Sequence, residues 1–219
     1  MNWWANQWRN FTQTERKLAL LMFCMFGFGS IGINLSATKN LFEPLSSFTL
    51  LYAFFVLMIA HKSFSFRFTA VLTFAFCVGL AVEIIGVLSG KIFGRYEYTD
   101  ALGSQLMTVP FIIGINWISL TYVTNNIAAH LTKQKHIATI IAALAMVGFD
   151  VLIEPLAIKH HFWIWLDDGL PPLQNYISWF AVSLVLSLTY QFFITTKLNF
   201  MAILFSISLI FFLLADLLL

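Results

Sequence analysis

Charged side chains are scarce in this chain, and their scarcity decides its class. Only 10% of the 219 residues are Asp, Glu, Lys or Arg, whereas 60% are hydrophobic and the mean hydropathy is +0.85. Soluble domains carry roughly 25% charged residues. The composition therefore excludes an ordinary soluble domain and predicts an integral membrane protein. The lipid bilayer is its expected surroundings, and no nucleic-acid partner is expected.

Cysteine is also scarce, and the histidines are dispersed. Cys24 and Cys77 both lie in apolar stretches, which predicts no disulfide framework and provides no metal site by themselves. The five histidines form no pair four residues apart and no spaced cluster, which disfavours the membrane desaturases and hydroxylases that hold iron with several histidines. Only the adjacent His160 and His161 leave a weak metal site open in a loop.

The chain further lacks the residues that cofactor-binding membrane proteins require. A retinal photoreceptor needs a lysine deep in a span, yet the only lysine near the last apolar segment is Lys197, at its entry. No nucleotide-binding fingerprint is present. We therefore expect neither a metal nor a cofactor.

Long apolar runs make up most of what is present. They lack period-two alternation, so they predict an all-α integral membrane protein, a bundle of about seven transmembrane helices, rather than a β-barrel. Residues 1–16 carry tryptophans at helical spacing and predict an interfacial amphipathic segment instead of a signal peptide. Residues 17–219 predict a single polytopic domain. The expected spans are 17–36, 45–60, 67–89, 106–130, 136–156, 174–195 and 198–218.

Basic residues are distributed unevenly across the predicted membrane. Eight of the twelve lie on the side of the amino terminus, which the positive-inside rule assigns to the cytoplasm. The prediction is a multi-pass protein of the inner (plasma) membrane with its carboxyl terminus outside. Nine of the ten acids lie toward the outer half, where the two long connections, about 90–105 and 157–173, are also expected.

Three of those acids fall inside apolar segments: Glu83, Asp150 and Glu154. A carboxyl group in lipid is costly, usually faces the bundle interior and marks a functional site. Asp150 and Glu154 are four residues apart, hence on one helix face, and are not expected both to be ionised. The structural alternatives are that Glu83 only bridges packed helices and that Asp150 pairs with Lys159 or Arg95.

The spacing of small residues predicts where these acids point. Gly79, Glu83, Gly86 and Gly90 share one helix face, which is expected to pack closely against protein. Four helices are expected to converge on one outer cavity. Its other contributors are Pro110, Gly114, Asn116, Trp117 and Thr121 on the fourth span and Asn175, Trp179 and Ser183 on the sixth.

Several blocks between about 75 and 185 resemble one known family, the bacterial carotenoid-biosynthesis membrane proteins that act as carotenoid hydratases. Ser178 departs from the pattern, which usually has glycine there, and this leaves the substrate's identity open. The blocks are Glu83-Ile-Ile-Gly86, Gly90, Phe93-Gly94-Arg95-Tyr96-Glu97-Tyr98, Leu102-Gly103, Val109-Pro110, Asp150-Val-Leu-Ile-Glu154-Pro155, Trp163-Ile-Trp165 and Pro172-Leu-Gln-Asn175-Tyr-Ile-Ser-Trp179.

The resemblance implies addition of water to the terminal isoprenoid double bond of a lycopene- or γ-carotene-like substrate, with other enzymes of the carotenoid pathway as expected partners. An acid in a dry pocket would protonate the alkene, aromatic faces would hold the tertiary cation, and water would capture it. Asp150 or Glu83 is the expected proton donor, with Glu154 or the remaining acid positioning water. The expected substrate-binding residues are Arg95, Tyr96, Tyr98, Asn116, Trp117, Trp163, Trp165, Asn175 and Trp179.

Three other functions use the same residues. A carotene cyclase shares the protonation step but lets an internal alkene capture the cation. A proton-coupled transporter would relay protons through the acids, although such proteins often show internal repeats that are not visible here. A carotenoid-binding protein would retain an unmodified pigment.

Overall fold

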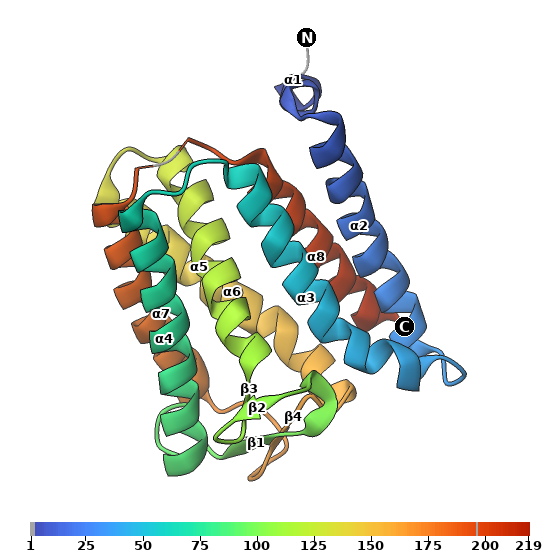
Figure 1. Ribbon diagram of the computed structural model, residues 1–219. Coiled ribbons are helices and arrows are strands. Elements are labelled where there is room, and N and C mark those ends of the chain that lie inside the picture. Colours follow the sequence, from blue (N-terminus) through green and yellow to red (C-terminus); the bar gives the residue numbers. More distant parts are fainter. Residues whose placement is uncertain (1–2, 196) are drawn as a thin grey trace.

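Helices account for most of this chain, because a helix satisfies its own backbone hydrogen bonds in hydrocarbon. The computed structural model describes residues 3–195 and 197–219 (Figure 1). Its α-helices are α1 (Trp3–Asn10), α2 (Gln13–Asn34), α3 (Lys39–His61), α4 (Phe66–Ser89), α5 (Phe111–Leu131), α6 (Lys135–Lys159), α7 (Leu173–Phe193) and α8 (Phe200–Leu218). The remaining elements are β1 (Tyr96–Tyr98), a 3-10 turn (Asp100–Leu102), β2 (Gln105–Leu106), β3 (Val109–Pro110) and β4 (Trp163–Trp165).

The predicted all-α membrane bundle is confirmed. Within the described chain, six helices, all of α2–α8 except α5, are long and apolar enough to cross a membrane. The exception, α5, has a comparable length of 21 residues, about 31 Å of helix. It is more polar because it lies in the middle of the bundle, where Thr121, Thr124, Asn125 and Asn126 are buried against protein. The two amides bond to neighbouring segments, Asn125 to Ser187 of α7 at 3.0 Å and Asn126 to the backbone carbonyl of Lys197 at 3.1 Å.

Three helices start four or more residues away from their predicted first residue. The α2 helix begins at Gln13, not 17, because Thr12 and Glu15 form a capping box in which each side chain accepts a bond from the other's backbone N–H. Residues 13–16 therefore belong to helix α2, and the interfacial position of the segment before it stays a prediction. The α3 helix starts at Lys39 instead of 45 and accommodates Pro44 within its second turn. The α5 helix starts at Phe111, since residues 105–110 form the β2–β3 hairpin.

The helices are arranged around α5, which contacts α3, α4, α6, α7 and α8 (Figure 1). The first and last spans, α2 and α8, pack together and against α3, forming one side of the bundle. All four strands lie at one end of the bundle, together with the carboxyl terminus, and the amino terminus lies at the opposite end. The long connections thus gather on one face, as predicted. Which face of the membrane this is stays a prediction.

Candidate active site

The two long connections pair with each other. Strands β1 and β4 are antiparallel, with Tyr96 opposite Trp165 and Tyr98 opposite Trp163. Successive side chains of a strand alternate between faces, so these four aromatic residues share one face while the intervening Glu97 and Ile164 are exposed. The shared face is turned toward the ends of α4 and α6, where the acids lie. The aromatic side chains of both connections thereby become hydrogen-bond donors to one site.

Glu83 is surrounded by donors. The hydroxyls of Tyr96 and Tyr98 donate to its Oε2 at 2.6 and 2.9 Å, and the indole N–H of Trp117 donates to its Oε1 at 3.1 Å. Burial, and then the charge of the neighbouring Glu83, raises the pKa of both tyrosines above their ordinary value. Both hydroxyls therefore stay protonated and act as donors rather than bases. Each oxygen of Glu83 thus already has at least one donor.

Close approach of neighbouring elements fixes Glu83 in this position. A Cβ added at Gly79, one turn before Glu83, would lie 2.4 Å from the indole of Trp117. A Cβ at Gly86 would lie 2.7 Å from the ring of Phe93 and 3.2 Å from the Tyr96 hydroxyl. The predicted glycine face of α4 does pack against protein, and the absent side chains leave the space that the donors of Glu83 occupy.

Asp150 and Glu154 present a different pattern, because each keeps one oxygen uncommitted. The side-chain amide of Asn175 donates to Asp150 Oδ2 at 2.8 Å. The indoles of Trp163 and Trp165 both donate to Glu154 Oε2, at 3.1 and 2.9 Å. Among the described residues nothing donates to Asp150 Oδ1 or Glu154 Oε1, and neither atom is sealed inside the protein. Both oxygens are available to a molecule in the cavity.

Aromatic rings form the wall beside the acids. Trp117 and Trp179 stack with ring centroids 4.0 Å apart and planes 13° from parallel. Trp165 lies against Tyr96 at 5.1 Å, and Tyr98 lies against Trp163 at 5.8 Å. The electron-rich faces of such rings attract a cation. The site thus combines carboxyl groups with surfaces suited to positive charge.

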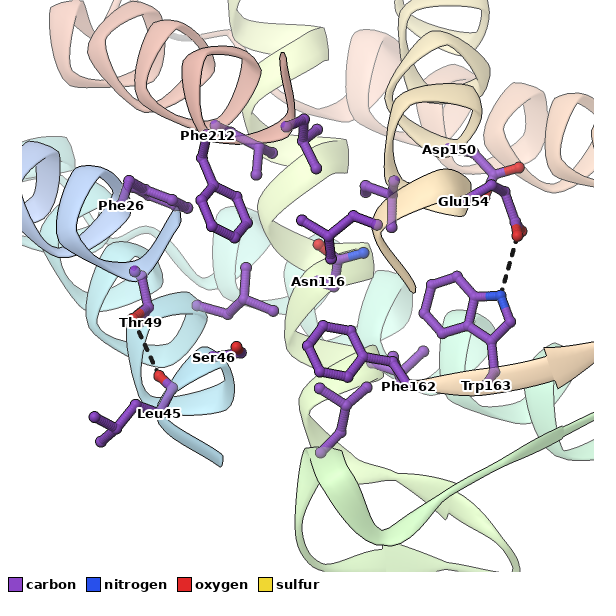
Figure 2. Close-up of a pocket in the computed structure, with 18 of the residues that line it drawn as sticks. Phe26, Leu45, Ser46, Thr49, Asn116, Asp150, Glu154, Phe162, Trp163 and Phe212 are labelled. Atoms are coloured by element: carbon purple, nitrogen blue, oxygen red, sulfur yellow. Dashed lines mark hydrogen bonds between the residues drawn. The ribbon is translucent and has the colours of Figure 1, made fainter. Parts of the chain in front are cut away.

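These groups close one end of a cavity of about 360 Å³. Figure 2 shows Asp150, Glu154 and Trp163 on one side and Phe26, Thr49 and Leu45 on the other, with Asn116 between them. Helices α4, α5, α6 and α7 all contribute, as the convergence of four spans predicted. Apart from the three acids, none of the described residues that line the cavity carries a charged side chain.

Most of the predicted substrate-binding residues line this cavity, and two do not. Tyr96, Tyr98, Asn116, Trp163, Trp165, Asn175 and Trp179 all line it. Trp117 lies behind Trp179 and reaches the cavity only through Glu83 and the indole stack. Arg95 lies outside it: its side chain is 64% exposed and its Nη1 contacts Asp167 at 3.0 Å. The neighbouring strand residues alternate in direction, which turns Arg95 away from the face that bears Tyr96 and Tyr98.

The cations proposed as alternative partners of Asp150 are engaged elsewhere. Arg95 pairs with Asp167, and Lys159 donates to the backbone carbonyl of Asp216 at 2.9 Å. His160 contacts Asp216 Oδ1 at 2.8 Å, so it joins α8 to the end of α6. Among residues 3–195 and 197–219, no group of three or more His, Cys, Asp and Glu side chains is placed to hold a metal.

Two features of the site were not predicted, although Phe93 and Leu102 stand in the blocks that carry the family resemblance. Phe93, Leu102 and Phe162 cover the cavity from the strand end, and all three are buried. The far part of the cavity is lined by α2, α3 and α8, where no motif had been recognised. The hydroxyl of Ser178, by contrast, donates to the backbone carbonyl of Ile92 and lies outside the cavity lining. This substitution therefore ties α7 to the β1 connection and adds no polar group to the site.

Fold and site together define a class: a multi-pass, all-α membrane protein in which buried carboxyl groups close one end of an apolar cavity. Residues 44–218 match the family described as carotenoid biosynthesis protein, and the chain belongs to this family. The expected membership of a carotenoid-biosynthesis membrane family is thereby confirmed, and the match includes every residue predicted for the site. No curated protein and no solved structure matches the chain. The family's description names a pathway and no reaction.

Proposed function

We propose that this protein is a carotenoid hydratase, which adds water across the terminal isoprenoid double bond of a carotene end group without a redox cofactor. The observation that carries the proposal is the pair of uncommitted carboxyl oxygens, Asp150 Oδ1 and Glu154 Oε1, at the closed end of an apolar cavity. Hydration of an alkene needs one group that gives a proton and another that accepts one from water. A membrane-embedded member of a carotenoid biosynthesis family provides the appropriate setting.

Asp150 is the proton donor in this scheme. Its Oδ2 accepts the Asn175 amide, as the carbonyl oxygen of a neutral carboxylic acid does, and this leaves Oδ1–H directed at the substrate. The π electrons of the alkene form a C–H bond at the less substituted carbon, and the O–H bond electrons remain on Asp150. A tertiary carbocation results. A simple alkene is a weak base, so the transfer depends on a dry pocket that leaves the acid unsolvated.

Aromatic side chains stabilise the cation until water arrives. Trp179 lines the cavity and is itself stacked on Trp117. Tyr96 and Trp165 form the adjacent wall. A desolvated cation over such a face gains about 2 kcal/mol or more, and the gain exists only once the charge has formed. It therefore lowers the barrier rather than binding the neutral alkene.

Glu154 receives the proton that water releases. Two indole N–H groups on Oε2 suit an ionised carboxylate and orient Oε1 toward the cavity. Water bound to Oε1 forms the new C–O bond and gives one proton to Glu154, so the alkene gains the elements of one water molecule. Asp150 and Glu154 are neighbours four residues apart on one helix, with Cβ atoms about 6 Å apart, close enough for a water molecule to return the proton to Asp150.

Glu83 has a positioning role in this scheme. Its three donors come from β1 and α5, so the carboxyl group joins α4 to the two elements that shape the cavity wall. Because both of its oxygens already accept hydrogen bonds, the proton transfer is assigned to Asp150 rather than to Glu83.

The test is expression in a host that makes an acyclic carotene, followed by mass spectrometry of the extracted pigments. A product heavier by one water supports the proposal, whereas a new product of unchanged mass identifies a cyclase. An unmodified carotene that copurifies with the protein identifies a binding protein. The Asp150→Asn/Glu154→Gln double variant should give no product. The matched control, Asp167→Asn/Asp168→Asn, removes two acids from the exposed loop and should leave the yield unchanged.

A further inference from the structure

The cavity continues well past the acids, and its far part takes no role in the proposed chemistry. We propose that this part is a lateral entrance from the hydrocarbon layer between α2 and α3, and that the polyene chain of the carotenoid occupies it during the reaction. The protein would then take its substrate end-first and act on one end at a time, whatever group the other end carries. This inference rests on the proposed function, since it places the same substrate.

The acid end offers no way in. Glu83, Asp150 and Glu154 are each only 3% exposed. From the strand end, buried Phe93 and Phe162 cover the space beside them. A large substrate therefore has to reach the acids from the opposite end of the cavity.

That opposite end reaches the outer surface of the bundle. Leu21, Cys24 and Phe28 of α2 line the cavity and are also exposed, Leu21 to 56% and Phe28 to 65%. Across from them, Leu45 of α3 lines the cavity and is 38% exposed. These residues lie within spans, so an opening there faces lipid chains rather than water. Figure 2 shows Leu45 and Thr49 at the side of the cavity away from Asp150 and Glu154.

A glycine leaves the passage clear. A Cβ at Gly29 of α2 would meet only the ring of Phe212, at 3.9 Å, which is ordinary contact. At Gly32, one turn later, a Cβ would lie 2.4 Å from the ring of Phe42, so that glycine is required by packing. Gly29 is not required in this way, although glycine weakens a helix interior. Its effect is to leave room at the cavity wall.

The size and chemistry of the cavity select a polyene as the occupant. About 360 Å³ is at the small end of the range for ligand sites, roughly 300–1,000 Å³. It holds an end group and the adjoining part of a carotenoid, so the rest of the chain has to project outward. Met25, Phe26 and Phe212 offer this chain an apolar and largely aromatic surface. The second end group remains in the bilayer, beyond the reach of any residue in the site.

The experiment compares Gly29→Phe with Gly27→Phe. Gly27 is on the same helix, lies outside the cavity lining, and has no heavy atom within 4 Å of an added Cβ. Initial rates of hydration are measured with purified protein in vesicles containing an acyclic carotene. Gly29→Phe should lower the rate by at least about tenfold, because one misplaced group in an apolar pocket commonly costs that much. Gly27→Phe should match the wild type, and equal rates for the two variants would overturn the entrance.

A second pair of variants approaches the passage from the other helix. Thr49→Trp narrows the cavity from α3, whereas Phe48→Trp changes a neighbour that is 63% exposed and outside the lining. If Gly29→Phe does not fold, the comparison of Thr49→Trp with Phe48→Trp tests the lateral entrance in its place: only Thr49→Trp should lower the rate. A carotene with one cyclic end should be hydrated at its open end as fast, per end, as an acyclic carotene. A strong dependence on the distant end group would contradict end-first binding.

Failure of the entrance and failure of the hydratase proposal give different results. If the wild type makes no hydrated product, the hydratase proposal is wrong. The entrance is then tested by the amount of carotene that each variant retains through purification. Loss of pigment from Gly29→Phe and retention by Gly27→Phe support the entrance without any reaction. Equal retention refutes it.

Discussion

Replacing Asp150 by Asn should remove the proposed proton donor and leave the fold of the site intact. The new side chain keeps a carbonyl oxygen to accept the Asn175 amide, which now donates to Oδ2 at 2.8 Å. Its NH₂ group takes the place of Oδ1 and faces the cavity, so the fold should lose no more than about 1 kcal/mol. The acidic proton is gone, however. General acid catalysis contributes roughly 10²- to 10⁴-fold, and the rate should fall by that factor.

Glu83→Gln should cost more stability and less activity than Asp150→Asn. Glu83 accepts three hydrogen bonds, and in Gln one oxygen becomes an NH₂ group that faces either Trp117 or the two tyrosine hydroxyls. A hydroxyl can turn and accept, whereas an indole N–H cannot, so the NH₂ group should face Tyr96 and Tyr98. The rearrangement should cost roughly 1–2 kcal/mol of stability, with a rate loss of about tenfold, the factor that 1.4 kcal/mol represents.

The assay measures both quantities on the same preparations. Purified variants in vesicles are supplied with an acyclic carotene, the initial rate of hydrated product is followed by chromatography and mass spectrometry, and the melting temperature is recorded in parallel. The assignment of Asp150 as donor is refuted if Glu83→Gln loses as much activity as Asp150→Asn while remaining equally stable.

Three further predictions concern packing, surface charge and pH. Gly79→Ala should lower stability by about 1–3 kcal/mol, measured as a fall in melting temperature, because the new Cβ would lie 2.4 Å from Trp117. Arg95→Gln removes an exposed ion pair with Asp167, so it should cost less than about 1 kcal/mol of stability and leave the hydration rate unchanged. A large loss of rate would show that Arg95 contributes to substrate binding after all. Because the folded state raises the pKa of both β1 tyrosines, their contribution to stability should be constant up to about pH 9 and fall above about pH 10, where the same side chains ionise in the unfolded chain. Replacing both tyrosines by phenylalanine should reduce that alkaline fall in melting temperature.

Sequence reasoning was most successful where one physical constraint dominates. Hydrocarbon requires long apolar helices, so the bundle could be predicted from hydropathy alone. The cost of a carboxyl group in lipid directed attention to Glu83, Asp150 and Glu154, and helical spacing placed them at one end of the bundle. All three line the same cavity. Their chemical roles stay predictions.

What could not be predicted depends on contacts between segments far apart in the chain. The pairing of β1 with β4 joins residues about 67 positions apart, and the strands have three residues each, too few for a periodic signal. Their register decides that Trp163 and Trp165 bond to Glu154, not merely lie in an aromatic belt. The contribution of α2, α3 and α8 to the cavity was equally invisible, because an apolar residue that faces a cavity looks like one that faces lipid.

The two-stranded sheet also shows how the site is assembled from two similar half-sites. In each, a helix carries a glutamate near its end, and the strand that follows returns two aromatic donors to that same carboxyl group: Tyr96 and Tyr98 to Glu83, Trp163 and Trp165 to Glu154. Each half is local in sequence, and three residue pairs between the strands join them. A slip of one residue in this short pairing would turn the aromatic side chains of one strand to the opposite face. The protonation chemistry of the whole cavity therefore depends on the alignment of a sheet only three residues long.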